Sequence, residues 1–384
     1  MRDGWIETTL DGIADVIMGQ SPDGKSYNQE GNGLPFMQGS AEFGEHNPVP
    51  EKWCSDPKKI AEAGDLLLSV RAPVGDTNFA DQRIAVGRGL SIIRANKESL
   101  TEFIRLVIQL NVAELIASSG SGMFASITGR NLKEFKINLP PLPEQKRIVD
   151  LISSVDSYIE ALHQQLESAK RSRNAVLHAL LTTAGDDWET TTIGDISDFV
   201  SVRKSPEQLS ADSIYVGLEH LEPNNTSIDN FDSVSKVTSS LTPFDVGDVL
   251  FGRLRPYLHK VAIAEMFGFC SPEILVLRAN SKVLPQMLLL FCDADSTINI
   301  CVERSAGTRM PRTSTEDLAS IEIKLPPIVE QIKLAELSST FDTDISHLGI
   351  ALEKSRILRS GLLSDLLSGT HEIPASYDKV IGAA

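Results

Sequence analysis

The sequence repeats itself, and this internal repeat constrains the fold more than any other feature. The stretch that begins at Trp5 recurs 183 positions later from Trp188, and the Gly-Asp-apolar stretch of Gly64 recurs at the same interval from Gly247. The heptapeptide Leu-Pro-Pro-Leu-Pro-Glu-Gln at 139–145 recurs in a related form at 325–331, an interval of 186. Self-similarity over so long a period indicates one structural unit written twice, with loops of slightly different length.

Each copy opens with a region of mixed character, residues 1–143 in the first and 185–329 in the second. Short apolar runs such as Leu66–Val70 are bounded there by Gly, Pro and Asp, which is typical of short strands joined by irregular loops. We therefore expect two small domains of the α/β (α+β) class.

Each copy closes with a long segment without proline beyond its first turn, in which apolar residues recur in alternating steps of four and three. This heptad pattern predicts long helices over residues 144–184 and 330–370, followed by a tail at 371–384. Arg173 and Arg359 interrupt the pattern at the same step. Two helices that share phase and interruption indicate an intramolecular coiled coil, and about 40 residues give each helix roughly 60 Å. The predicted seam of the helix pair consists of Ile148, Ile152, Val155, Ile159, Leu162, Leu166, Val176, Leu180, Leu334, Phe341, Ile345, Leu348, Leu352, Leu362 and Leu366.

Composition and charge narrow the function. Hydrophobic residues make up 41% and charged residues 23%, as in globular proteins. No apolar run is long enough to cross a bilayer and the N-terminus lacks a signal peptide, so we expect a cytoplasmic protein without membrane contact. The net charge is −16 and neither domain is basic overall, so a nucleic-acid interface would need a local basic stripe and help from a partner.

No cluster of residues suggests catalysis or a metal site. The cysteines, at positions 54, 270, 292 and 301, lack metal-ligand spacing and are expected to be buried thiols. Residues 19–26 match the phosphate-binding loop pattern, but glycines and a proline soon follow, so no helix can start there to hold phosphates. We expect a surface loop and no enzyme activity in this chain.

Basic side chains cluster at matching places in the two domains, after the Gly-Asp-apolar strand and in the Ser/Thr/Gly-rich loop before the repeated proline motif. Arginine and lysine can bond guanine edges or phosphates, so these clusters are the candidate DNA contacts. Lys25, on the loop at 19–26, and Tyr27, just after it, can meet a phosphate or a base. The candidates are Lys25, Tyr27, Arg71, Arg83, Arg88, Arg130, Arg253, Arg255, Tyr257, His259, Lys260, Arg309 and Arg312.

The duplicated proline motif that opens a leucine-rich helix resembles type I restriction-modification specificity subunits, the HsdS family. Stretches at 18–22, 34–36, 69–75, 215–219, 254–258 and 260–264 resemble the target-recognition domains of that family. The resemblance covers nearly the whole chain. The second copy departs from the first in two respects. Val329 stands where the first copy has Pro143, and Ser338 and Ser355 place polar side chains on the seam of the second helix.

The resemblance implies two target-recognition domains in a pseudo-twofold arrangement, joined by two long antiparallel helices. Each domain reads one half of a split, asymmetric double-stranded DNA sequence. It also implies two modification subunits that bind S-adenosylmethionine and methylate adenine, and restriction subunits that use ATP and magnesium. No cofactor site is expected in this chain.

Three other interpretations remain open from the sequence. The chain could serve a related system with a fused nuclease-methyltransferase, it could be a coiled-coil adaptor that does not read DNA, or it could be an ATPase that uses residues 19–26. Neighbouring genes, salt-sensitive DNA binding and nucleotide titration, respectively, distinguish these interpretations from the first.

Overall fold

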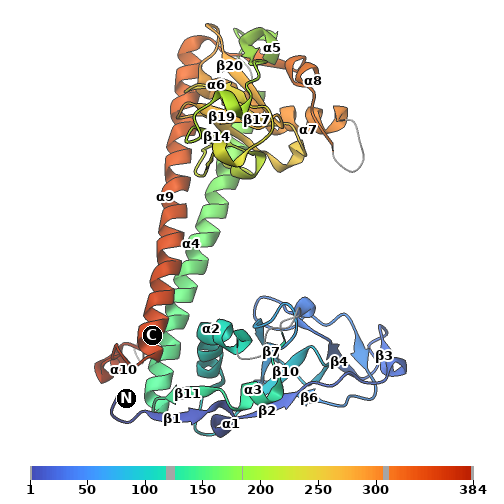
Figure 1. The fold of residues 1–384 in the computed structure, drawn as a ribbon, viewed down its shortest axis with the longest axis vertical. Coiled ribbons are helices and arrows are strands. Elements are labelled where there is room, and N and C mark those ends of the chain that lie inside the picture. Colours follow the sequence, from blue (N-terminus) through green and yellow to red (C-terminus); the bar gives the residue numbers. More distant parts are fainter. Residues whose placement is uncertain (1, 118–125, 184, 306–310, 382–384) are drawn as a thin grey trace. The chain divides into compact units, whose positions relative to one another are not determined.

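The computed structural model describes residues 2–117, 126–183, 185–305 and 311–381 (Figure 1). The chain divides into two units, each with its own set of internal contacts. Unit 1 comprises residues 1–161 and 352–384, and unit 2 comprises residues 162–351. Each unit therefore contains one domain and a stretch of both long helices.

Unit 1 is built around an antiparallel four-stranded sheet in the order β2-β10-β7-β8. Strand β7, Leu66–Ser69, is buried at every position because the sheet is covered on both faces. Helix α2, Thr101–Ala117, lies in the same core, where Phe103 and Ile104 are fully buried. The other strands of this sheet are β2 (Ala14–Met18), β8 (Thr77–Phe79) and β10 (Leu90–Ala95).

A second sheet extends unit 1, and a short ribbon ties its ends together. The five-stranded sheet has the order β3-β5-β4-β9-β6, with β3 (Tyr27–Asn28), β4 (Leu34–Met37), β5 (Trp53–Cys54), β6 (Ile60–Ala61) and β9 (Ile84–Val86). The ribbon pairs β1 (Ile6–Thr9) with β11 (Lys136–Leu139). Short helical elements are α1 (Leu10–Ile13), η1 (Gly24–Ser26), η2 (Ser40–Glu42), α3 (Gly129–Lys133), η7 (Ala375–Tyr377) and α10 (Asp378–Ile381).

Unit 2 repeats this plan with its own loops. Its central sheet has the order β13-β20-β17-β18, formed by β13 (Ser197–Phe199), β17 (Val249–Gly252), β18 (Val261–Ile263) and β20 (Ile274–Ala279). A second sheet, β15-β14-β19-β16, contains β14 (Ile214–Val216), β15 (Asp232–Ser233), β16 (Thr242–Phe244) and β19 (Gly268–Cys270), and the ribbon pairs β12 (Glu189–Thr192) with β21 (Glu322–Leu325). The helices are α5 (Ile193–Ile196), η3 (Pro206–Gln208), η4 (Leu218–His220), η5 (Val234–Lys236), η6 (Pro256–Leu258), α6 (Pro285–Asp293), α7 (Asp295–Arg304) and α8 (Thr315–Ala319).

The two long helices are α4, Leu142–Thr182, and α9, Ile328–Leu367. Both begin slightly before the expected residue. In α4 the first turn tolerates Pro143, because the first N–H groups of a helix have no partner within the helix and proline loses nothing by lacking one. Helix α9 is followed by Gly369, which adopts a left-handed φ of +74° and ends the helix. The predicted mixed fold with two long paired helices is confirmed.

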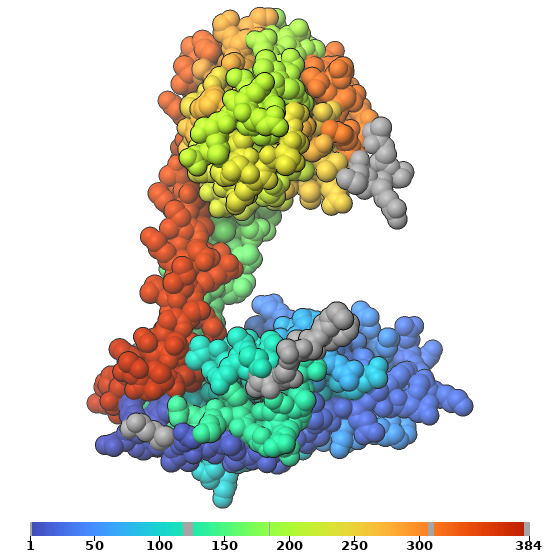
Figure 2. Space-filling view, in the orientation of Figure 1, coloured from blue at the N-terminus to red at the C-terminus, as the bar shows by residue number. Residues whose placement is uncertain are grey.

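The helices pack antiparallel within each unit (Figure 1). In unit 1 Asp156 of α4 pairs with Arg359 of α9, and Arg147, which is earlier in α4, pairs with Asp378, which follows α9. Residues earlier in α4 therefore contact residues later in the chain, as in an antiparallel pair. Figure 2 shows the C-terminal segment in red against the blue N-terminal segment, where Arg2 pairs with Glu372. Both termini of unit 1 are thus fastened beside the helix pair.

The predicted seam is largely occluded from solvent. Its buried members are Ile148, Ile152, Leu162, Leu166, Leu334, Leu352 and Leu366, and its partly buried members are Val155, Ile159, Leu180, Phe341, Ile345, Leu348 and Leu362. The expected seam does not hold at Val176, which is 37% exposed, whereas Leu177 is 5% exposed. At this point α4 turns its apolar face toward the core of unit 2, which Leu177 joins together with Trp188.

The arginines that interrupt the heptads form matching ion pairs between the helices. In unit 2 Arg173 of α4 lies 2.7 Å from Asp342 of α9. In unit 1 Arg359 of α9 bonds Asp156 of α4, with Nη2 2.8 Å from Oδ2. The two arginines and the two aspartates are each separated by the repeat interval of 186, so the same contact is made twice with the helices exchanged.

The repeated Glu-Gln dipeptide joins each long helix to its domain. The indole of Trp5 donates to Glu144 at 3.0 Å, and that of Trp188 donates to Glu330 at 2.9 Å. The buried amide of Gln145 accepts from the backbone of Leu100 and donates to two carbonyls, and Gln331 makes the equivalent three bonds. These bonds explain why the motif recurs where a helix leaves a domain.

Candidate DNA interface

The loop after β7 presents the first candidate of unit 1. Ser69 ties this loop by donating to the carbonyls of Arg71 and Pro73, and the amide of Ile127 donates to the carbonyl of Val70. The Arg71 side chain is exposed, and no residue in the described part of the chain pairs with its guanidinium. Its backbone is held by the loop while its charge remains available to a ligand.

A second group in unit 1 gathers Lys25, Tyr27 and Arg88. The Tyr27 hydroxyl donates to the carbonyl of Pro22 at 3.0 Å, and its ring stacks on Phe36 with centroids 4.7 Å apart. Burial raises the pKa of Tyr27, and the nearby charge of Arg88 opposes this shift. Lys25 and Arg88 are exposed and have no ion-pair partner among the residues the structure describes. The Tyr27 side chain therefore stabilises the loop, whereas the two cations face solvent.

The remaining candidates of unit 1 already have acidic neighbours. Arg83 lies 3.4 Å from Glu62, and Arg130 lies 2.9 Å from Glu134, one turn along α3. All four side chains are well exposed, so each pair is weak and can exchange for a phosphate.

In unit 2 several candidates are engaged inside the domain. Arg253 donates to the carbonyl of Thr313 at 3.1 Å, and burial followed by the charge of Arg312 lowers its pKa. Arg312 bonds Glu273 at 2.9 Å, and Lys260 donates to the carbonyl of Leu218 at 2.8 Å. Arg253 and Lys260 are thus structural in this conformation, although the sequence favoured them as DNA contacts.

The turn after β17 carries the exposed candidates of unit 2. Arg255 adopts a left-handed φ of +54° and its side chain is exposed without an ion-pair partner in the described ranges. Tyr257, in η6, is 51% exposed. His259 lies against two carboxylates, those of Asp293 and Asp295. Arg309 lies outside the described residues.

The structure therefore divides the candidates by what they contact. Arg71 and Arg255, on the equivalent loops after β7 and β17, are exposed and unpaired among the described residues, as are Lys25 and Arg88. Candidates with internal partners are Tyr27, Arg83, Arg130, Arg253, His259, Lys260 and Arg312. Sequence reasoning missed the acids that hold them, although the repeat interval linking Asp156 to Asp342 was a readable signal for the helix pair.

The phosphate-loop lookalike forms no helix. Gly24–Ser26 is a single 3-10 turn that leads into the strand β3, so no α-helix starts at the position where the phosphate-binding pattern would need one. The four cysteines are free and buried, and burial raises the pKa of Cys270 to about 12. Among the described residues no group of His, Cys, Asp or Glu is arranged to hold a metal ion. Of the described helices, none combines the length and apolar character needed to traverse a bilayer.

Two like-folded domains, each joined to a pair of long helices, form the architecture expected of a DNA-recognition subunit with two reading domains. The model of the type I restriction modification DNA specificity domain matches residues 2–171 and again residues 185–353. The chain belongs to this family. It is the DNA sequence-specificity subunit of a type I restriction-modification system and is not a catalytic subunit.

Proteins named as type I specificity subunits are similar to this chain over part or most of its length. The putative type I restriction enzyme MjaX specificity subunit of Methanocaldococcus jannaschii is 41% identical over 168 residues, which are 44% of this chain and 40% of that relative. The type I restriction enzyme EcoDI specificity subunit of Escherichia coli is 21% identical over 85% of each chain. A solved structure from work on complex assembly and conformational transition of the type I R-M system covers 96% of this chain and 98% of its own, with a TM-score of 0.63 at 14% identity. At that identity the likeness concerns the fold.

Proposed function

We propose that each unit reads one part of a split, asymmetric DNA sequence, and that the paired helices set the gap between the two parts. The observation that carries this proposal is the placement of Arg71 and Arg255 on equivalent loops of two repeated domains, exposed and unpaired among the described residues. An arginine can fork onto the O6 and N7 atoms of guanine in the major groove. Helices of 41 and 40 residues suit a spacer between two reading domains.

The acidic balance of the chain requires help from partners. A net charge of −16 opposes approach to phosphates, and among the described candidate contacts only Lys25, Arg71, Arg88 and Arg255 are exposed cations without an ion-pair partner. We therefore infer that phosphate contacts come largely from two modification subunits docked on this chain, which also flip out the target adenine. S-adenosylmethionine belongs to those subunits, and ATP and magnesium belong to restriction subunits. The assembly works on cytoplasmic DNA.

Alanine at Arg255 is expected to weaken sequence-specific binding by the assembled complex by about 1–3 kcal/mol and to relax selectivity at one base pair. The reason is that the side chain would lose a bidentate base contact while its loop keeps its backbone bonds. Competition binding with single-base variants of the methylated sequence measures both effects.

Lys282→Ala is the matched control, because Lys282 is also an exposed cation of unit 2 but lies on the loop before α6. It removes the same charge and should leave base selectivity unchanged. Equal effects of the two variants would mean that Arg255 acts only through charge. If the wild-type complex shows no sequence-selective, salt-sensitive DNA binding, the adaptor interpretation is favoured instead.

A further inference from the structure

The turn between β17 and β18 holds an unusual backbone. Arg255 and His259 flank η6, and both adopt left-handed conformations, with φ of +54° and +48°. This region is unfavourable for residues other than glycine, so contacts elsewhere must hold the turn. The backbone bonds that do so include Gly252 N–H to the carbonyl of Lys260, at 2.8 Å, and Asn224 N–H to the carbonyl of His259, at 3.1 Å.

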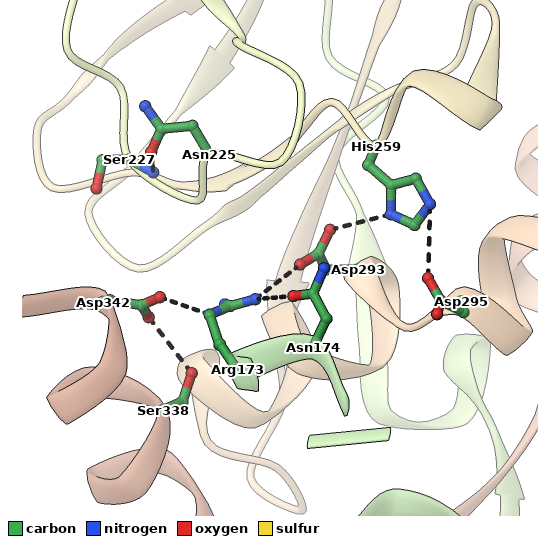
Figure 3. A network of polar contacts seen from close by, with 9 residues as sticks. All are labelled: Arg173, Asn174, Asn225, Ser227, His259, Asp293, Asp295, Ser338 and Asp342. Carbon is green, nitrogen blue, oxygen red and sulfur yellow. Dashed lines mark hydrogen bonds and ion pairs between the residues drawn. The ribbon is translucent and has the colours of Figure 1, made fainter. Parts of the chain in front are cut away.

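The His259 ring lies between two acids at the junction of α6 and α7 (Figure 3). Its Nδ1 is 3.6 Å from Asp293 at the end of α6, and its Nε2 is 3.7 Å from Asp295 at the start of α7. Because each ring nitrogen faces a carboxylate, only the imidazolium, which carries a proton on both nitrogens, is attracted to both acids. The turn that presents Arg255 and Tyr257 is thereby held against α6 and α7.

Asp293 continues the contact to the helix pair. Its other oxygen lies 3.4 Å from Arg173 Nη1, and Arg173 Nε lies 2.7 Å from Asp342 of α9 (Figure 3). Asn174 and Ser338 complete the network through Arg173 and Asp342. A continuous series of ionic contacts therefore runs from His259 to both long helices within unit 2.

We propose that His259 is a positioning residue that fixes the Arg255–Tyr257 turn against α6 and α7 and, through Asp293 and Arg173, to the helix pair. This inference rests on the proposed function, since it assigns the turn a part in reading DNA. It gives His259 a role inside the protein in place of a contact to DNA.

The charge of His259 should control this attachment. The groups that face it are Asp293 of α6 and Asp295 of α7, with Arg173 behind Asp293. His178 of α4 lines a pocket beside these two acids. The carboxylate of Asp293 is the main cause that raises the pKa of His259, against the effect of burial. A raised pKa means that the attachment is complete below the ordinary histidine value and is lost as the pH rises through the pKa of the folded state.

Unit 1 provides a built-in comparison. Its equivalent turn, between β7 and β8, has Gly75 at the left-handed position, with a φ of +102°. A Cβ there would lie 2.0 Å from Cγ2 of Val112, so this turn packs its backbone directly on α2. Since that contact involves no ionisable group, reading by unit 1 should not share the pH dependence.

The test measures base selectivity of the assembled methyltransferase complex between pH 6 and 9 for the wild type, His259→Asn and Asp295→Asn. Asparagine tolerates the left-handed backbone but carries no charge. At pH 6 His259→Asn should lose selectivity for the half-sequence read by unit 2 by on the order of tenfold, the effect of one pKa unit. The wild type should approach this variant as the pH rises, Asp295→Asn should do so at lower pH, and selectivity for the other half-sequence should stay constant. Equal selectivity of the wild type and His259→Asn at every pH would overturn the proposal.

A second measurement separates this inference from the proposed function. Histidine NMR titration of the full chain should place His259 above the ordinary histidine pKa, and Asp295→Asn should lower it. An unshifted His259 that does not respond to Asp295→Asn would overturn the attachment, whether or not the complex reads DNA. If the complex showed no sequence selectivity, the proposed function would be refuted. The NMR titration would then be the only test of the contact between His259 and its two acids.

Discussion

Arg173→Ala should lower the free energy of unfolding of unit 2 by roughly 3–5 kcal/mol, because it leaves two acids without their common partner. The Arg173 side chain is only 7% exposed, and it lies 2.7 Å from Asp342 and 3.4 Å from Asp293. Removing the guanidinium creates a cavity between α4, α6 and α9 and leaves like charges facing each other. Hydrogen exchange of unit 2 in the full chain, followed through a urea series, measures the loss separately from unit 1.

Arg359→Ala is the matched control, because Arg359 makes the equivalent contact in the other copy. Its side chain is 22% exposed and that of Asp156 is 35% exposed, so water replaces the lost partner more easily. We expect a loss of about 1 kcal/mol in unit 1, near the upper end for exposed pairs. Equal losses for the two variants would contradict the view that burial makes the Arg173 contact the stronger one.

The second large effect is expected for Asp248→Ala, at roughly 3 kcal/mol, since three charge-assisted hydrogen bonds disappear together. The Asp248 carboxylate is 2% exposed and accepts from Nε and Nη2 of Arg278 and from the amide of Asp245. These bonds fasten the start of β17 to Arg278 of β20. The hydrogen bonds with Asp248 are also the main cause that raises the pKa of Arg278. Denaturant unfolding monitored in unit 2 tests this expectation.

Two further variants, one at an exposed acid and one at the equivalent buried acid of unit 1, serve as comparisons for Asp248→Ala. Asp245→Ala removes a carboxylate that also bonds Arg278, at 2.5 Å, but is well exposed, so its loss should stay below about 1 kcal/mol. Asp65→Ala removes the equivalent acid of unit 1, which bonds Arg94 and the amide of Glu62 in the same way, and should match Asp248→Ala. A small effect at both buried acids would mean that the Gly-Asp motif recurs for another reason.

Much of the architecture was predictable because its signals are local or repeated. Heptad spacing sets one face of a helix toward its partner, and the repeat interval reveals two copies whatever their detailed fold. The exception at Val176 arises because the core of unit 2, assembled from distant residues, competes with the partner helix for the apolar face of α4. No local pattern encodes that competition.

The candidate interface was less predictable for the same reason. Arg253, His259 and Lys260 follow an exposed-looking pattern, but their partners come from remote segments, such as Asp293 on α6 and Leu218 in η4. A side chain's direction in a loop depends on those long-range contacts. The arginines at the helix seam were visible as interruptions, and the shared interval of their acidic partners could have identified the pairs before the structure.

A domain exchange decides whether each domain reads its own part of the DNA sequence. The chain is expressed with its modification partners, methylated adenines are mapped across the host genome, and residues 1–143 are then exchanged for the corresponding domain of a relative. One half of the methylated sequence should change while the other half and the gap between them stay the same. Methylation that continues with both halves unchanged, or a change in both halves together, would show that the two domains do not read separate parts of the sequence.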